Sequence, residues 1–191
     1  MARYSEDHRE QSHRRIVAAG GQLLRTEGLR SPLRSIMKSI DMTKGAFYHH
    51  FDSKDAFLLE ALEDVFEATK ARWASRLEGL SGPSRIAAML DRYLSEDHLQ
   101  GVAEGCVVPS ILSDLSRVPE RLKGPFEGYF EWLVSDIAGH LEGEDRRERA
   151  SALLSTAIGA ITVARGIGDS RARLGVLEAA RLCGRRLAGC D

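Results

Sequence analysis

The stretch MTKGAFYHHF, residues 42–51, places lysine, glycine, tyrosine and two histidines beside two phenylalanines. Lysine supplies a point charge for phosphate, while threonine, tyrosine and histidine side chains can hydrogen-bond phosphate oxygens or base edges. Glycine inside a helix costs about 1 kcal/mol relative to alanine, so its use here needs a reason. Close approach of another backbone is such a reason. These residue types therefore predict contact with nucleic acid.

A helix over 44–51 is expected, with Thr43 at its cap and with Phe47 and Phe51 packed inward. So short a helix does not persist alone in water, and it must be held by packing. The predicted contacts on this helix are Thr43, Lys44, Gly45, Ala46, Tyr48, His49 and His50. Three further contacts are predicted at the starts of the neighbouring helices, because the free amides of a helix N-terminus bind anions. They are Ser31, Arg34 and Lys54, the last of which follows Ser53. On spacing alone, the same residues also fit the surface of an ordinary helical bundle.

The preceding helix, over 32–40, should begin with Ser31 as its cap and Pro32 at its first position. Asp41 and Met42 alone separate it from the cap at Thr43, so the two helices must meet at a steep angle. Two short helices joined in this way form a helix-turn-helix. Aspartate tolerates a positive φ at such a turn, although glycine would fit better.

The formal net charge of -1 is unevenly distributed. Residues 1–54 hold ten basic against six acidic residues, a net of +4, and four of the six histidines. The remaining residues hold seventeen basic against twenty-two acidic residues, a net of -5. A basic front joined to an acidic body favours a nucleic-acid-binding head on a separate body.

Helical periodicity runs through almost the whole chain of 191 residues, which predicts an all-α protein. About nine helices are expected, over 5–27, 32–40, 44–51, from 53 onward, 84–99, 106–117 (interrupted by Pro109), 119–141, 145–167 and 170–188. Residues 1–52 are predicted to form the helix-turn-helix domain, and residues 53–191 a helical regulatory and dimerisation domain. Three cysteines, no leader and no long apolar run favour a soluble cytoplasmic protein without disulfides.

Residues 14–62 resemble the N-terminal DNA-binding domain of TetR-family transcriptional regulators. The likeness rests on the "EG" that ends the first helix, the apolar stripe of the second, and the signature TKGAFYHHFDSKDAFL. It implies that the DNA-facing residues are Thr43, Lys44, Gly45, Tyr48 and His50, and that Lys54 contacts a backbone phosphate. The chain departs from the family at Asp41, where glycine is usual, and at Ser39 and Ile40, where alanines are usual. Both departures affect the angle between the two helices. They therefore affect whether Ala46 and His49 reach the DNA bases.

The second half resembles the family more loosely, through GCVVPSILSDLSRVPERL and LLSTAIGAITVARGIGD. A two-fold dimer is predicted because one small recognition helix gives little specificity, whereas a dimer reads two half-sites of a palindromic operator. Its interface is placed on the last two helices, where small residues (Gly159, Ala160, Ala164) permit close approach, at Leu153, Leu154, Ala157, Ile158, Ile161, Leu174, Leu177, Ala180 and Leu187. The alternative is that these residues complete each subunit's own core.

An apolar pocket with a few polar groups is predicted among the middle helices, lined by Met89, Tyr93, Cys106, Ile111, Phe126, Tyr129, Phe130 and Trp132. A small, largely apolar effector bound there would shift the two heads through the helix after Ser53 and release DNA. The sequence therefore predicts a sequence-specific transcriptional regulator, taken as a repressor in line with the resemblance, with no cofactor and no membrane partner.

Two other classes are weighed against this reading. A helical adaptor that binds protein instead of DNA would fit the same helical pattern. An enzyme is disfavoured, because HExxH, GxSxG, P-loop and GxGxxG motifs are missing from the sequence. Cys106 near His98 is thin support for a nucleophile or a metal site, so no catalytic residue and no metal ligand is predicted.

Overall fold

A computed structural model of the chain describes residues 2–190, with side chains described from residue 9 onward. Within that range the protein is all-helical, as predicted, but has ten α-helices and one short 3-10 helix instead of about nine helices. The elements are α1 (Ala2–Glu27), α2 (Leu33–Ser39), α3 (Lys44–Tyr48), α4 (Lys54–Arg76), α5 (Gly82–Tyr93), α6 (Glu96–Gln100), α7 (Val108–Leu115), η1 (Glu120–Leu122), α8 (Gly124–Ala138), α9 (Arg146–Gly166) and α10 (Ser170–Ala188).

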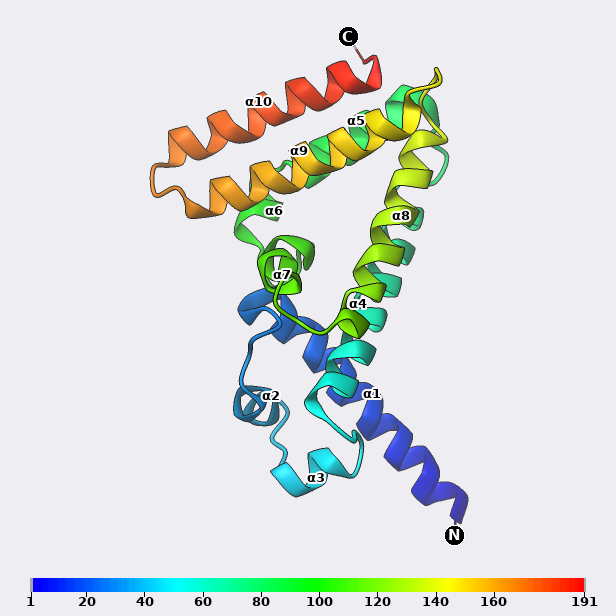
Figure 1. Cartoon of the computed structure of the whole chain (residues 1–191), viewed down its shortest axis with the longest axis vertical. Helices are drawn as coiled ribbons and strands as arrows, with labels where there is room; N and C mark the ends of the chain where they lie inside the picture. The colour runs from blue at the N-terminus through cyan, green and yellow to red at the C-terminus, as the bar shows by residue number, and fades with distance from the viewer. Residues whose placement is uncertain (1, 191) are drawn as a thin grey trace.

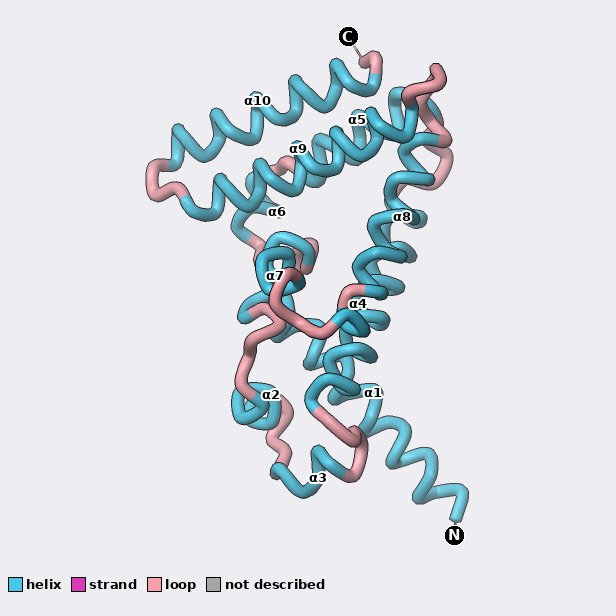
Figure 2. The backbone as a smooth tube through the Cα atoms, viewed as in Figure 1, coloured by secondary structure: helices cyan, strands magenta, loops and turns pink. Residues whose placement is uncertain are grey.

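The molecule is elongated, with α2 and α3 at one end and the paired helices α9 and α10 at the other (Figure 1). Helices α4 and α8 run along the long axis between the two ends, and α1 crosses α4 (Figure 2). The described residues contain no helix both long and apolar enough to cross a membrane.

Helix α1 packs closely on α4 because a glycine lies at the crossing. A Cβ built on Gly20 would lie 2.5 Å from the Phe57 ring and 3.0 Å from the Ala61 side chain. Any larger residue at position 20 would therefore push the two helices apart. This contact joins the first helix of the head to the helix that continues into the body.

In the body, three of the predicted helix boundaries are wrong. The helix expected over 84–99 ends at Tyr93, and α6 begins anew because the Ser95 hydroxyl accepts a hydrogen bond from the His98 amide at 3.1 Å. The helix expected over 119–141 is divided into η1 and α8, since Pro125 sits in the first turn of α8 and cannot lie inside a continuous helix. Pro109 does not interrupt α7 but starts it.

The predicted capping of α2 by Ser31 is also wrong. The cap position is taken by Pro32, without a side-chain hydrogen bond to the helix amides. The Ser31 hydroxyl is buried and donates to the Glu27 carboxylate at 2.8 Å, so it ties the end of α1 to the following turn.

The turn between α2 and α3 contains a left-handed aspartate, as its position suggested. Asp41 has a φ of +50°, and among the described non-glycine residues no other has a positive φ. Side chains in this region are strained by contact between Cβ and the backbone, and only glycine escapes that strain.

We expect Asp41→Gly to raise the free energy of unfolding by about 0.5–1 kcal/mol, because relief of the backbone strain outweighs the entropy that glycine adds to the unfolded chain. Asp41→Val should lower it by more than about 1 kcal/mol, since a β-branched residue fits this region worst. Urea unfolding of both variants measures the two effects. A glycine variant as unstable as the valine variant would contradict this account of the turn.

Candidate nucleic-acid interface and effector pocket

Helix α3 is only five residues long and is fixed at both ends. At its start, the Thr43 hydroxyl accepts a hydrogen bond from the Ala46 amide at 3.2 Å, as predicted. Phe47 is fully buried, and its ring centroid lies 5.2 Å from that of Phe51 and 5.5 Å from that of Phe57 on α4. The helix ends at Tyr48 instead of Phe51, so Phe51 packs from the turn that follows.

The outer side of α3 carries the predicted lysine and tyrosine. Tyr48 is 46% exposed, and the Lys44 ammonium lies 6.0 Å from the centre of its ring. Thr43, Gly45 and His49 are also exposed. A Cβ built on Gly45 would meet nothing within 4 Å, so the protein's own packing does not require glycine there. Helix α3, which carries this lysine and tyrosine, lies at one end of the molecule (Figure 1).

Among the other predicted contacts, Arg34 is exposed on α2 and Ala46 is half-buried on α3. Three further predicted contacts are buried or half-buried within the chain. Ser31 is 4% exposed, so its assignment as a surface contact is wrong. The Lys54 ammonium donates to the Leu29 carbonyl at 3.4 Å, and desolvation lowers its pKa. His50 is half-buried, with its ring centroid 5.8 Å from that of His13 on α1.

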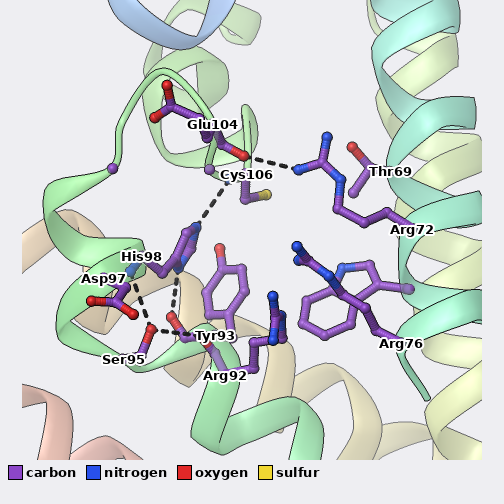
Figure 3. Close-up of a pocket in the computed structure, with 13 residues that line it drawn as sticks. Thr69, Arg72, Arg76, Arg92, Tyr93, Ser95, Asp97, His98, Glu104 and Cys106 are labelled. Carbon is purple, nitrogen blue, oxygen red and sulfur yellow. Dashed lines mark hydrogen bonds between the residues drawn. The ribbon is translucent and has the colours of Figure 1, made fainter.

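A pocket of about 420 Å³ lies between α4, α5, α6 and the loop before α7. Figure 3 shows Arg72 and Arg76 of α4 and Arg92 of α5 pointing into it, opposite the loop that holds Glu104 and Cys106. The sequence-based reading missed these arginines, since charges on a helix face usually point to solvent. The available signal was the i, i+4 spacing of Arg72 and Arg76, which places them on one side of α4.

An apolar recess of about 20 Å³ lies behind this pocket, and Trp73, Tyr93 and Cys106 line both spaces. Of the predicted pocket residues, Met89, Tyr93, Cys106 and Tyr129 do line the recess. Ile111, Phe126, Phe130 and Trp132 line neither space: Ile111 is buried in the core on α7, and the three aromatic residues are half-buried against the core on α8. The middle helices therefore bring together half of the predicted set.

His98 fixes the wall of the pocket through both ring nitrogens. Its Nε2 accepts a hydrogen bond from the Cys106 amide at 3.0 Å, so Nδ1 carries the proton and donates to the Tyr93 carbonyl at 2.5 Å. The ring thus binds the backbone of Cys106. Burial raises the pKa of the Cys106 thiol, which opposes formation of a nucleophilic thiolate. Among the described residues, no histidine, cysteine and carboxylate groups cluster as metal ligands would.

The pocket is connected to the head by hydrogen bonds from α1. The Arg25 guanidinium donates to the Gly105 carbonyl at 3.0 Å, and the Ser110 hydroxyl donates to the Arg25 carbonyl at 2.6 Å. One turn later, the Leu29 amide donates to the Asp114 carboxylate at 3.1 Å. Gly28 is required at this junction, since it has a φ of +74° and a Cβ would lie 2.7 Å from the same carboxylate.

Most residues predicted for a dimer interface are buried within the chain itself. Leu153, Leu154, Ala157, Ile158, Ile161, Leu177 and Ala180 are each at most 8% exposed, and Leu187 is half-buried. They join α9 and α10 to each other and to the body. The outward apolar residues of these helices are Val163, Leu174 and Leu182, which are 44–55% exposed.

A helix-turn-helix head joined to a helical body is the architecture of a DNA-binding regulator. Residues 16–61 match the family described as "Bacterial regulatory proteins, tetR family". The segment that holds the helix-turn-helix therefore belongs to this family.

Two curated relatives and two solved structures are similar to a larger part of the chain. The repressor NemR of Escherichia coli is 27% identical over 139 residues, which cover 71% of this chain and 69% of NemR. The repressor DhaR of a Mycobacterium species is 28% identical over 148 residues, which cover 73% of each chain. Among solved structures, reduced E. coli NemR superposes with a TM-score of 0.78 and 22% identity over 92% of this chain and 96% of that one. A TetR regulator from Chloroflexus aurantiacus superposes with a TM-score of 0.80 and 21% identity, over 94% and 95%.

Protonation of His98 should destabilise the fold. Desolvation lowers its pKa in the folded chain, so the unfolded chain takes up the proton first as the pH falls. The free energy of unfolding should therefore be fully present above the ordinary histidine pKa of about 6.5 and decrease below it. Urea unfolding from pH 8 to pH 5 measures the slope. His98→Gln keeps an acceptor but cannot titrate, so its slope should be shallower, and an unchanged slope would contradict the assignment.

Proposed function

We propose that this protein is a cytoplasmic transcriptional repressor that binds a palindromic operator as a homodimer and is released by a small, largely apolar effector. Residues 1–52 would read DNA, and residues 53–191 would bind the effector and the second subunit. The observation that carries the proposal is the exposed lysine and tyrosine side of α3, held outward by the buried Phe47. The similar proteins NemR and DhaR are both transcriptional repressors, which supports the choice of repression.

Lys44→Ala should weaken binding to all DNA sequences, because a lysine that contacts phosphate releases counterions on binding. The slope of log affinity against log salt should become shallower by about 1 for each bound subunit. Tyr48→Ala should weaken operator binding by about 1 kcal/mol or more. Fluorescence anisotropy with operator and scrambled duplexes, over a range of salt, measures both effects.

Lys70→Ala serves as the matched control, since it removes the same charge from α4, where Lys70 pairs with Glu67. It should leave operator affinity and the salt slope close to those of the wild type. Wild-type affinity in the Lys44→Ala, Tyr48→Ala double variant would overturn the proposed DNA interface. The operator itself can be selected from a random DNA pool, where a palindrome is the expected product.

The outer faces of α9 and α10 support dimerisation. Small residues (Ala152, Gly159, Gly166 on α9; Ala172, Gly175, Ala179 on α10) recur among the outward positions at roughly helical spacing. A Cβ on Gly159, Gly166 or Gly175 would meet nothing within 4 Å, so these glycines are not required by the subunit's own packing. Two such helix pairs can approach closely and cover the exposed Leu174 and Leu182.

Leu182→Glu should weaken the dimer at least about tenfold, because the interface would bury an unpaired carboxylate on each subunit. Sedimentation velocity at micromolar concentration should then show a shift toward monomer. Leu112→Glu, at a comparably exposed leucine on α7, should leave the dimer intact. A wild-type monomer, or a dimer unaffected by Leu182→Glu, would exclude this interface.

The hydrogen bonds that connect the pocket to α1 support release of DNA by an effector. The loop that lines the pocket is held at Gly105 by Arg25 of α1, and α7 holds the end of α1 through Ser110 and Asp114. An effector that moves this loop would therefore move α1 and the helix-turn-helix packed on it. The shift in operator affinity can be no larger than the effector's preference for one of the two arrangements.

A further inference from the structure

We infer that the pocket of Arg72, Arg76 and Arg92 binds a small organic anion with a short apolar tail, a carboxylate or a phosphate monoester. This inference rests on the proposed effector response and adds the chemical class of the effector. The three guanidinium groups would hold the anionic head, and the apolar tail would lie on the Trp73 and Tyr93 rings.

The three arginines form a concentration of positive charge that the chain does not neutralise. Among the described residues, none of the three guanidinium groups has a carboxylate partner within 4.0 Å. Arg72 donates only to the Glu104 carbonyl at 2.9 Å. Desolvation and the charges of Arg92 and Arg72 lower the pKa of Arg76, as expected for like charges that share one space.

Two carboxylates lie at the rim of the pocket but do not neutralise the three guanidinium groups. Figure 3 shows the carboxylates of Asp97 and Glu104 pointing away from the three guanidinium groups, toward the outside of the loop. Both residues are exposed. The centre of the pocket therefore keeps its positive charge.

A buried hydroxyl without an oxygen or nitrogen partner points into the same space. The Tyr93 oxygen is inaccessible to solvent and has no oxygen or nitrogen partner among the described residues, and its polar neighbour is the Cys106 thiol. Figure 3 shows it directed toward the Cys106 sulfur, beside the His98 ring. Sulfur is a weak acceptor, whereas a buried hydroxyl donor normally finds a strong one. An anionic oxygen would accept from this hydroxyl as well as from the arginines.

The apolar part of the ligand follows from the aromatic residues beside the arginines on α4 and α5. Trp73 and Tyr93 line the charged pocket and also the recess behind it, where Met89, Tyr129 and Leu133 supply apolar surface. The recess is only about 20 Å³, so the tail must lie mainly in the outer space of about 420 Å³. A single ring or a short chain suits that space better than a long acyl chain.

Isothermal titration calorimetry of the full chain against four probes tests the inference without DNA. Benzoate and phenyl phosphate carry an anionic head on one ring, benzamide carries a neutral head on the same ring, and inorganic phosphate lacks the ring. We expect benzoate or phenyl phosphate to bind at least about tenfold more tightly than benzamide, because charge-assisted hydrogen bonds are the stronger ones. Phenyl phosphate should also bind more tightly than inorganic phosphate. The better of the two organic anions identifies the head group.

The double variant Arg76→Gln, Arg92→Gln should lose at least about tenfold in affinity for the better anion. Both side chains are exposed and make no hydrogen bond within the described chain, so the fold should survive. Tyr93→Phe should lose several-fold by removing the hydroxyl alone. Arg146→Gln, at an exposed arginine on α9 without a described contact, is the matched control and should bind like the wild type.

Equal affinity for benzamide and the organic anions, no anion binding at millimolar concentration, or unchanged binding in the double variant would overturn the inference. Equal affinity for inorganic and phenyl phosphate would overturn its apolar part. A separate arm measures operator affinity with and without the bound anion. Failure of that arm alone would count against the proposed effector response and would leave the anion site intact.

Discussion

The buried cluster of Phe47, Phe51 and Phe57 is the contact on which the DNA-facing end of this protein depends. A helix of five residues has almost no stability of its own, so α3 exists only because its phenylalanine is held between the turn that follows and α4. His13 of α1 stacks on Phe51 at a centroid distance of 4.6 Å, which adds the first helix to the same cluster. The orientation of Lys44 and Tyr48 is therefore set by aromatic packing behind them and not by the helix that carries them.

The same cluster joins the head to the body. Phe57 belongs to α4, and it contacts α1 at Gly20, where no Cβ could fit. Arg72 and Arg76 lie near the far end of that same helix, beside the pocket. A second connection runs from the pocket loop through Arg25 to α1. The head is thus held by two routes that begin at the pocket, one along α4 and one through hydrogen bonds to α1.

The helix-turn-helix could be predicted from the sequence because the signals that define it are local. Caps at Thr43 and Ser53, a four-residue spacing of phenylalanines and a turn at Asp41 act within a few residues of each other. The dimer face could not be separated from the core in the same way. Leu153 and Leu182 have the same chemistry, and only the packing of α9 on α10 decides that one is buried and the other exposed. Half of the residues predicted for the pocket do line the recess, because aromatic and apolar side chains suggested them. The arginines were not predicted, because they come together only after α4 and α5 fold back on each other.

Arg72 both lines the pocket and donates to the Glu104 carbonyl, and this double use has a consequence for how the pocket and its loop are linked. A guanidinium carries five N–H donors and the loop uses one of them, so the remaining donors could hold an anion without releasing the loop. One side chain would then both attract the anion and tie it to the loop.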